Sequence, residues 1–295
     1  MARSPMMTFC APLPEIIKRR RSCRTFEKKS IAAVTAAQLH AVAGSLQHGP
    51  FQTSLRFELV ADGDKEARAL KGLGTYGFIK NPAGFLIGAV GPGEKNLEDF
   101  GFAMEALILY ATSLGLGSCW LGGSFNKSRF AARVRAAAAE IVPAVAAVGY
   151  PAEETRLRAL MRIQIKADVR KPWHTLFFRN DMETPLAEES AGAYAGPLHM
   201  LRLAPSASNK QPWRVVQQNA CFHFYLLRSS GDQRHRSPLL SFTTADLQRV
   251  DMGIAMCHFQ LTSEEMGLKG EWRVADPGLA KPNELVEYIA SWVKE

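Results

Sequence analysis

The sequence predicts helices and strands in mixed layers, arranged as two related lobes of one chain. Three observations lead to this prediction. Segments with strand periodicity alternate with segments that carry a helical apolar stripe. One helix, over residues 97–114, is apolar on almost every face and is expected to be buried. The sequence of this helix returns, with changes, 152 positions later.

The first half of the chain contains six segments with a clear helical or strand pattern. In order, they are a short helix over 14–21, a helix over 34–43, a strand over 56–60 that ends at Asp62–Gly63, a continuously apolar strand over 84–90, the long helix, and an apolar strand over 144–149. Pro14 suits a first helical turn, and Ser30 or Thr35 could cap the second helix. Gly115 and Gly117 are expected to end the long helix.

A shift of 152 positions brings eight identical residues into register between residues 99–120 and 251–272. Asp99 then matches Asp251, Gly115 matches Gly267, and Trp120 matches Trp272. Looser similarity relates 38–42 to 197–201, the strand at 56–60 to 214–216, and 144–149 to 288–293. A period this long indicates domain duplication and not a repeat array. We expect a first lobe over residues 1–185 and a second, shorter lobe over 186–295, with elements that cross from one lobe to the other.

The charge, the cysteine spacing and the apolar runs of the sequence limit the classes of function that it could have. The net charge is +8 and the calculated isoelectric point is about 9.3, which can attract nucleic acid or small anions such as nucleotide cofactors. No nucleic-acid-binding motif accompanies the charge, so we expect no nucleic-acid partner. The five cysteines have no metal-ligand spacing, and no metal is expected. No apolar run has the length of a membrane span or signal peptide, so a cytoplasmic protein without membrane contact is expected.

Two segments offer groups suited to an anion. Arg20, Ser22 and Arg24 alternate along the chain, so on an extended backbone their side chains share a face and could hold a phosphate and a polyol. The alternative is a solvated basic turn. Arg170, in the run 170–174, could supply a further cation, or belong to an exposed charged turn.

Two further segments could approach a flat heterocycle. Residues 115–125 are rich in glycine and could present backbone N–H groups, although a helix end followed by a tight turn explains them equally. Residues 205–213 are more specific. Prolines restrict this segment at both ends, and its hydroxyl and amide groups could match the edge of a uracil-like ring.

Taken together and in this order, these segments resemble the nitroreductase family, in particular its single-chain branch with two fused lobes, over about residues 15–292. The resemblance implies an α+β fold in which each lobe has a mixed or antiparallel sheet packed by helices. It implies flavin mononucleotide (FMN) as cofactor, held where the two lobes meet as it is held between subunits of relatives. The phosphate and ribityl chain would contact Arg20, Ser22, Arg24 and Arg170. The ring would contact Pro205, Ser206, Ala207, Ser208, Asn209 and Gln211, with backbone N–H groups of Leu121, Gly122 and Gly123 near its N5 atom.

The sequence departs from the family pattern at three places. Relatives carry the Pro-Ser-x-x-Asn loop in the first lobe, where this chain has residues 45–51 of different sequence. The second lobe has no Arg-x-Ser-x-Arg segment, so the symmetry-related second site is expected to be empty. A glutamate that some relatives carry in the N5 loop is replaced by glycine.

The expected function is electron transfer from NAD(P)H through FMN to a small-molecule acceptor such as a nitroaromatic or quinone. The flavin supplies the chemistry, so no catalytic side chain is assigned. Dehydrogenation or dehalogenation on the same fold, and a flavin-binding protein without turnover, remain as alternatives. Because both lobes lie in one chain, we expect a monomer with internal pseudo-two-fold symmetry.

Overall fold

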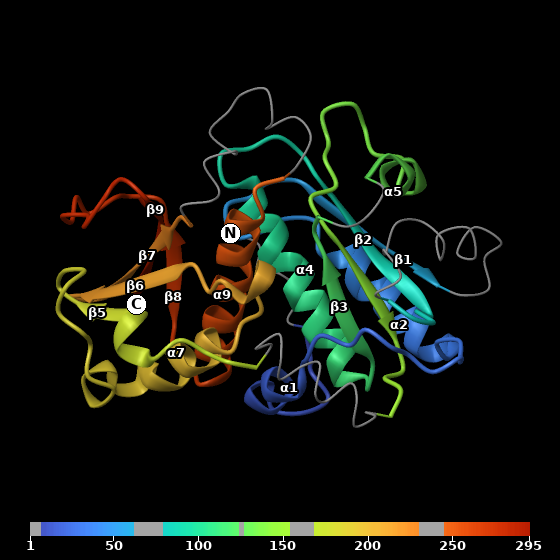
Figure 1. The fold of residues 1–295 in the computed structure, drawn as a ribbon, viewed down its shortest axis with the longest axis horizontal. Helices are drawn as coiled ribbons and strands as arrows, with labels where there is room; N and C mark the ends of the chain where they lie inside the picture. Colours follow the sequence, from blue (N-terminus) through green and yellow to red (C-terminus); the bar gives the residue numbers. More distant parts are fainter. Residues whose placement is uncertain (1–6, 62–78, 124–126, 154–167, 230–244) are drawn as a thin grey trace. The chain divides into compact units, whose positions relative to one another are not determined.

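A computed structural model describes residues 7–61, 79–123, 127–153, 168–229 and 245–295. The chain divides into two compact units, residues 1–156 and 157–295, and each unit is built around one β-sheet (Figure 1). Segment 168–186 precedes the second repeat in sequence but makes its contacts in the second unit. The lobe limits of 1–185 and 186–295 concern the duplicated sequence and stay a prediction.

The first unit is a four-stranded antiparallel sheet with helices. Its described elements are α1 (Leu13–Arg19), α2 (Ala33–Ser45), β1 (Leu55–Ala61), β2 (Gly84–Val90), α4 (Asn96–Ser113), β3 (Gly117–Leu121), α5 (Lys127–Arg133) and β4 (Val145–Gly149). The strand order is β1-β2-β4-β3, and every neighbouring pair is antiparallel. All segments expected from the sequence in this unit are present within a few residues of their expected limits.

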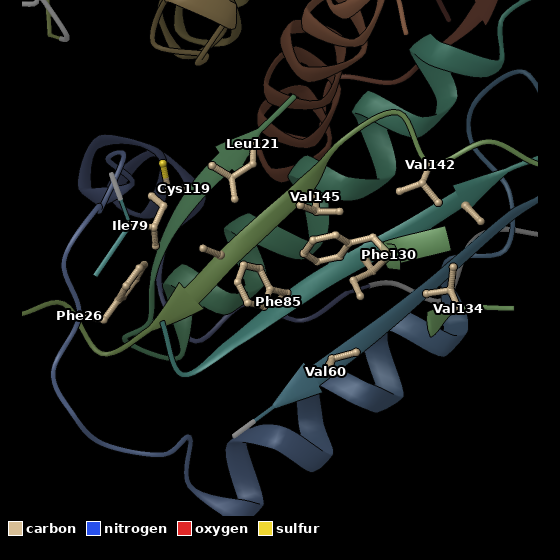
Figure 2. Packing of buried hydrophobic residues seen from close by; sticks show 13 residues of the cluster. Phe26, Val60, Ile79, Phe85, Cys119, Leu121, Phe130, Val134, Val142 and Val145 are labelled. Atoms are coloured by element: carbon tan, nitrogen blue, oxygen red, sulfur yellow. The ribbon is translucent and has the colours of Figure 1, made fainter. Parts of the chain in front are cut away.

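One apolar cluster of the first unit joins the sheet to α5 and to the segment before α2 (Figure 2). Phe85 of β2 meets Phe130 of α5 edge to face, with ring centroids 5.4 Å apart. Phe26 reaches the same cluster from the N-terminal segment and is 1% exposed. The cluster thereby anchors the chain just after the basic segment 19–24 to the central strands.

The second unit has a five-stranded sheet. Its described elements are η1 (Trp173–Thr175), β5 (Phe177–Arg179), η2 (Glu189–Tyr194), α7 (Ala195–Arg202), η3 (Ala207–Asn209), β6 (Trp213–Gln218), β7 (Cys221–Leu227), α9 (Leu247–Glu265), β8 (Gly270–Arg273) and β9 (Val286–Lys294). The strand order is β5-β6-β7-β9-β8. β5 runs parallel to β6, and all other pairs are antiparallel.

The topology of the two units agrees with a duplicated arrangement. The series α2, β1, β2, α4, β3, β4 of the first unit corresponds to α7, β6, β7, α9, β8, β9 of the second. The sheet order β1-β2-β4-β3 becomes β6-β7-β9-β8, and β5 is an additional strand at the β6 edge. Two sheets of the same order and direction, connected through a helix at the same place, are the structure that the 152-residue repeat predicts.

The repeated helices α4 and α9 also end in the same way. Gly115 and Gly267 have φ values of +83° and +73°, in the left-handed region that favours glycine. After each glycine, the next N–H returns to the helix: Leu116 N donates to the Ala111 carbonyl at 3.0 Å, and Leu268 N donates to the Ser263 carbonyl at 2.8 Å. This is the C-terminal capping pattern expected for Gly115, and it recurs 152 residues later.

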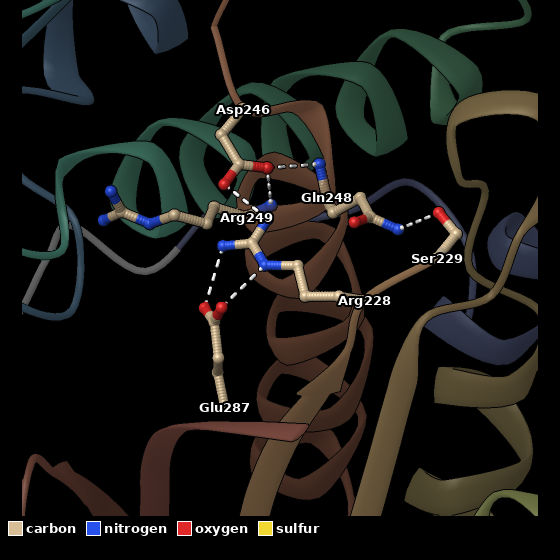
Figure 3. A network of polar contacts seen from close by, with 6 residues as sticks. All are labelled: Arg228, Ser229, Asp246, Gln248, Arg249 and Glu287. Atoms are coloured by element: carbon tan, nitrogen blue, oxygen red, sulfur yellow. Dashed lines mark hydrogen bonds and ion pairs between the residues drawn. The ribbon is translucent and has the colours of Figure 1, made fainter. Parts of the chain in front are cut away.

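The start of α9 is fixed by a polar network (Figure 3). Asp246 is the N-cap, and its carboxylate accepts hydrogen bonds from the backbone N–H groups of Gln248 and Arg249. Arg228, just after β7, donates to Asp246 and makes a two-point contact with Glu287 at 3.0 and 2.8 Å. The network therefore joins the helix start to two neighbouring strands of the sheet.

Two local expectations are wrong. α2 begins after Ala32, and no side chain caps it, so neither Ser30 nor Thr35 has the expected role. Residues 117–121 form strand β3 and not a glycine loop, because they pair with β4 across the sheet. Asp62–Gly63 lies outside the described residues. Among the helices that the structure describes, none has the length and apolarity needed to cross a membrane.

Candidate functional site

The predicted phosphate-binding residues lie where α1 ends and the chain becomes extended. α1 ends at Arg19, and Arg20 has extended backbone angles (φ −62°, ψ 120°). Ser22 then forms a parallel bridge with Ser118 of β3, and Cys23 N donates to the Ser118 carbonyl at 2.7 Å. The sheet of the first unit thus fixes the backbone of this segment. Arg20 is buried, Ser22 is half-buried and Arg24 is exposed.

Arg20 is held by a buried carboxylate and keeps a donor without a partner. Its Nε lies 3.7 Å from Oε1 of Glu105 in α4, and Trp120 Nε1 donates to the other oxygen of Glu105 at 2.8 Å. Arg20 Nη1 is buried and makes no hydrogen bond with the described residues, and the same is true of the Ser118 hydroxyl. Buried donors without partners are rare in native proteins, and they fit an anion with oxygen acceptors.

The charges of Arg20 and Arg24 both affect the pKa of Cys119 in β3. Burial raises the pKa of the Cys119 thiol above its ordinary value, while Arg24 and Arg20 oppose that shift through their positive charge. Both arginines are therefore close enough to β3 to influence one side chain on it. Arg20, Ser22 and Arg24 thus lie on one short segment that runs beside β3, and their joint contact with a phosphate stays a prediction.

The residues expected near the flavin N5 atom follow directly from this strand. Leu121 is the last residue of β3 and is buried, whereas Gly122 is half-buried and Gly123 is exposed. Residues 124–126 lie outside the described part of the chain. The N5 contact of these three backbone N–H groups stays a prediction, but their place at the end of β3 differs from the free loop expected from the sequence.

The predicted ring-binding segment lies in the second unit, between α7 and β6. Three of its residues, Ser208, Asn209 and Gln211, have φ values of +52°, +53° and +49°. Non-glycine residues rarely adopt this left-handed conformation, and clusters of such residues are typical of functional sites. The corresponding loop of the first unit has one left-handed residue, Gln52.

Each repeated helix holds the loop of its own unit through an aspartate at the same position. In the second unit, the Asp251 carboxylate accepts the Ala207 N–H, at 2.9 and 3.1 Å from its two oxygens. In the first unit, the Asp99 carboxylate accepts the N–H groups of Phe51 and Thr53, both at 2.8 Å. The sequence repeat already paired these aspartates, although it gave no reason for their conservation between the two lobes.

Segment 169–171 fixes the polar side chains of the ring-binding loop. Gln211 is 3% exposed; its Oε1 accepts the Lys171 N–H at 2.8 Å, and its Nε2 donates to the Val169 carbonyl at 3.1 Å. Asn209 donates to the same carbonyl at 2.9 Å. Arg170 Nη1 lies 3.4 Å from Asn209 Oδ1, so the structure places Arg170 beside this loop. Its expected contact with the phosphate stays a prediction.

Pro205, Ser206, Ala207 and Ser208 form the remainder of this loop. Gln211 N donates to the Ser206 hydroxyl at 2.9 Å, so Ser206 helps to close the turn. Ser208 is exposed, and Pro205 and Ala207 are half-buried. Because the Asn209 and Gln211 side chains are used within the chain, Ser208 and the turn backbone are the groups that this loop most readily offers to a ligand.

Sequence reasoning missed four residues that shape these two half-sites. Glu105 and Ser118 adjoin Arg20 and Ser22, and the buried carboxylate in the middle of an apolar helix was the available signal for Glu105. Lys171 and Arg214 flank Gln211, and both are basic residues next to expected ligand residues.

Comparisons with known proteins identify the family and the fold. A family described as "Putative TM nitroreductase" matches residues 13–263. A crystal structure of a protein from Thermotoga maritima MSB8, described as a putative nitroreductase, is similar over 99% of this chain and 98% of that chain, with a TM-score of 0.58 and 18% identity. A search of curated proteins finds no match.

Two further solved structures match about half of the chain. A nitroreductase family protein from Clostridium novyi NT covers 49% of this chain and 87% of its own, with 23% identity and a TM-score of 0.39. An FMN-dependent nitroreductase from Clostridium difficile R20291 covers 48% of this chain and 88% of its own, with 22% identity and a TM-score of 0.36.

Proposed function

The chain belongs to the TM nitroreductase family, and from this premise we propose that it is an FMN-dependent oxidoreductase. NAD(P)H would be the electron donor, and an electron-poor small molecule such as a nitroaromatic or a quinone would be the acceptor. The observation that carries the proposal is that Nη1 of Arg20 and the hydroxyl of Ser118 are buried and have no hydrogen-bond partner among the described residues. These groups fit a phosphate ester, which FMN carries and which an apolar substrate lacks.

The residues of the chain would bind and orient the cofactor. Arg20, Ser22 and Arg24 would hold the phosphate and ribityl end, with Arg170 as a further cation. The loop from Pro205 to Gln211 would hold the ring, since its backbone is already fixed by Asp251 and by segment 169–171. FMN, when bound, would supply the hydride and electron chemistry, so no side chain needs to act as a nucleophile.

The first test is the visible absorption spectrum of the purified protein during titration with FMN. We expect a flavin spectrum shifted from that of free FMN and saturation at one FMN per chain, because only one copy of each binding segment is present. NADH or NADPH should then bleach the spectrum under anaerobic conditions, and a nitroaromatic or quinone should restore it. A protein that binds FMN but is not bleached would be a passive flavin binder.

A pair of arginine variants tests the phosphate assignment. Arg20→Ala should weaken FMN binding, whereas Arg21→Ala, which removes the same charge from an exposed neighbour, should leave it almost unchanged. Equal losses in the two variants would show that overall charge, and not the buried guanidinium, attracts the cofactor. FMN binding is measured directly, by quenching of flavin fluorescence, so the result does not depend on finding the acceptor.

A further inference from the structure

Two cations of the second unit share one backbone acceptor beside the ring-binding loop. Lys171 Nζ donates to the Gln211 carbonyl at 3.4 Å, and Arg214 Nη1 donates to the same oxygen at 3.3 Å. Arg214 Nη1 also donates to the Trp213 carbonyl at 2.6 Å. Two positive groups on one carbonyl oxygen are close neighbours, and their mutual repulsion is unfavourable unless an anion accompanies them.

No carboxylate balances this pair. Neither Lys171 nor Arg214 makes an ion pair with any residue that the structure describes. Burial lowers the pKa of Arg214 to about 10, and burial together with the charge of Arg214 lowers the pKa of Lys171. Both shifts have the direction expected for cations that have lost water and gained no counter-charge.

The duplication provides an internal comparison. Arg56 of β1 and Arg214 of β6 are the second residues of corresponding strands, since Leu55 pairs with Val90 and Trp213 pairs with Leu226 at the start of each ladder. Arg56 makes a two-point contact with Glu140, at 3.1 and 2.6 Å, which raises its pKa. The same strand position therefore has an acidic partner in the first unit and none among the residues described in the second.

The cation pair is held in a fixed frame. The backbone N–H of Lys171 donates to Gln211 Oε1 at 2.8 Å, and the Lys171 carbonyl accepts from Nε of Arg202 at 2.7 Å. Arg214 is fixed through Nη1, and its Nε and Nη2 make no hydrogen bond with the described residues. Lys171 and Arg214 are both half-buried, so the pair is reachable from solvent.

We infer that Lys171 and Arg214, both in the second unit, form a binding site for a phosphate group, in addition to the FMN phosphate contacts proposed for Arg20, Ser22 and Arg24. One phosphate oxygen can accept from the ammonium while others accept from the free edge of the guanidinium, which is the geometry that a guanidinium provides for phosphate. The ligand is inorganic phosphate or the phosphate of a nucleotide. Because both cations bind the Gln211 carbonyl, an anion here would contact the base of the ring-binding loop.

The test is a calorimetric titration with inorganic phosphate at low ionic strength. It is done on the wild-type protein and on Arg20→Ala, in which the proposed FMN phosphate cluster is disabled. We expect saturable binding of phosphate in the Arg20→Ala protein, weakened at least about tenfold when Lys171→Gln is added. Arg56→Gln, a control at the position of the first unit that corresponds to Arg214, should leave this affinity unchanged. No saturable binding, or binding that ignores Lys171→Gln, would overturn the inference.

Competition separates the two ligand sources and distinguishes this site from the proposed cofactor site. NADPH that displaces phosphate at lower concentration than NADH would identify a nucleotide phosphate as the ligand, and displacement by neither would identify inorganic phosphate. Displacement of phosphate from the wild-type protein by one equivalent of FMN would overturn the inference, since the pair would then belong to the flavin site. If FMN does not bind at all but phosphate still binds in a manner that depends on Lys171, only the proposed function fails and the inference stands.

Lysine labelling tests the same inference on the wild-type protein, without any substitution. A lysine with a lowered pKa is acetylated more readily at neutral pH, so Lys171 should react faster than exposed lysines with acetic anhydride. Phosphate should slow the acetylation of Lys171 and leave that of Lys28, an exposed lysine of the first unit, unchanged. Mass spectrometry of the labelled protein measures both rates, and equal protection of the two lysines would contradict a specific site.

Discussion

Asp251 and its counterpart Asp99 allow the role of the ring-binding loop to be tested with a control inside the same chain. Asp251→Ala removes both oxygens that accept the Ala207 N–H, at 2.9 and 3.1 Å. Asp99→Ala removes the acceptors of Phe51 and Thr53 in the corresponding loop of the first unit. Both changes damage the same structural device, but only the first loosens a loop that is proposed to hold FMN.

We expect Asp99→Ala to cause the larger loss of stability and Asp251→Ala to cause the larger loss of FMN affinity. A buried donor left without a partner costs about 1–3 kcal/mol. Ala207 is half-buried, so Asp251→Ala should cost about 1–2 kcal/mol, whereas Asp99→Ala strands two N–H groups, one of them on buried Thr53, and should cost more. If the bond pre-orders the loop, its loss should weaken FMN binding by up to about tenfold, because about 1.4 kcal/mol corresponds to a factor of ten.

Thermal denaturation and FMN titration measure the two effects separately. We expect Asp99→Ala to lower the melting temperature more than Asp251→Ala does, by about 2–4 °C for each kcal/mol. Only Asp251→Ala should weaken FMN binding. The reasoning is refuted if both variants lose FMN affinity equally, since that would mean a general loosening of the fold. It is also refuted if Asp251→Ala lowers the melting temperature and retains full FMN affinity.

Three further outcomes follow from single contacts. Glu105→Gln should strengthen FMN binding in a fluorescence titration, because the charge of Arg20 is then no longer balanced within the chain; unchanged affinity would argue against Arg20 as a phosphate ligand. Asp246→Ala removes the N-cap of α9 and the partner of Arg228, so chemical denaturation should show a loss of at least about 1 kcal/mol. Burial raises the pKa of the Asp99 carboxyl group above its value in the unfolded chain. The contribution of Asp99 to stability is therefore present below the unfolded pKa and is lost as pH rises through the folded pKa. When the free energy of unfolding is measured against pH, Asp99→Asn should lack this loss.

Much of the architecture could be predicted because its signals are local. The apolar runs of β2 and β4, the stripe of α4 and the glycine that ends it are properties of a few neighbouring residues, and each element is present. The repeat around Asp99 and Asp251 extended these predictions to the second unit. β5 and β8 gave no such signal, since they have three and four residues and exist because a neighbouring strand pairs with them.

The candidate site was predictable in its residue types and not in its contacts. The amides of Asn209 and Gln211 were expected to face a ligand, yet they bind segment 169–171, which is about 40 residues away in sequence. Such a contact depends on β5 lying beside β6, which no local pattern encodes. The reading of residues 117–121 as a loop failed for the same reason: glycine favours close backbone approach, and here the approaching backbone is β4.

The duplication separates what holds a loop from what the loop can bind. Both units keep the aspartate that fixes the loop, the glycine that ends the helix, and an arginine at the second position of the corresponding strands β1 and β6. They differ in the groups that could meet a ligand. In the first unit Arg56 is paired with Glu140, whereas in the second neither Arg214 nor Lys171 is paired with an acid that the structure describes, and the loop contains three left-handed residues. The shared features hold the loop and the helix end, whereas backbone strain and unbalanced charge cost stability and are typical of binding sites.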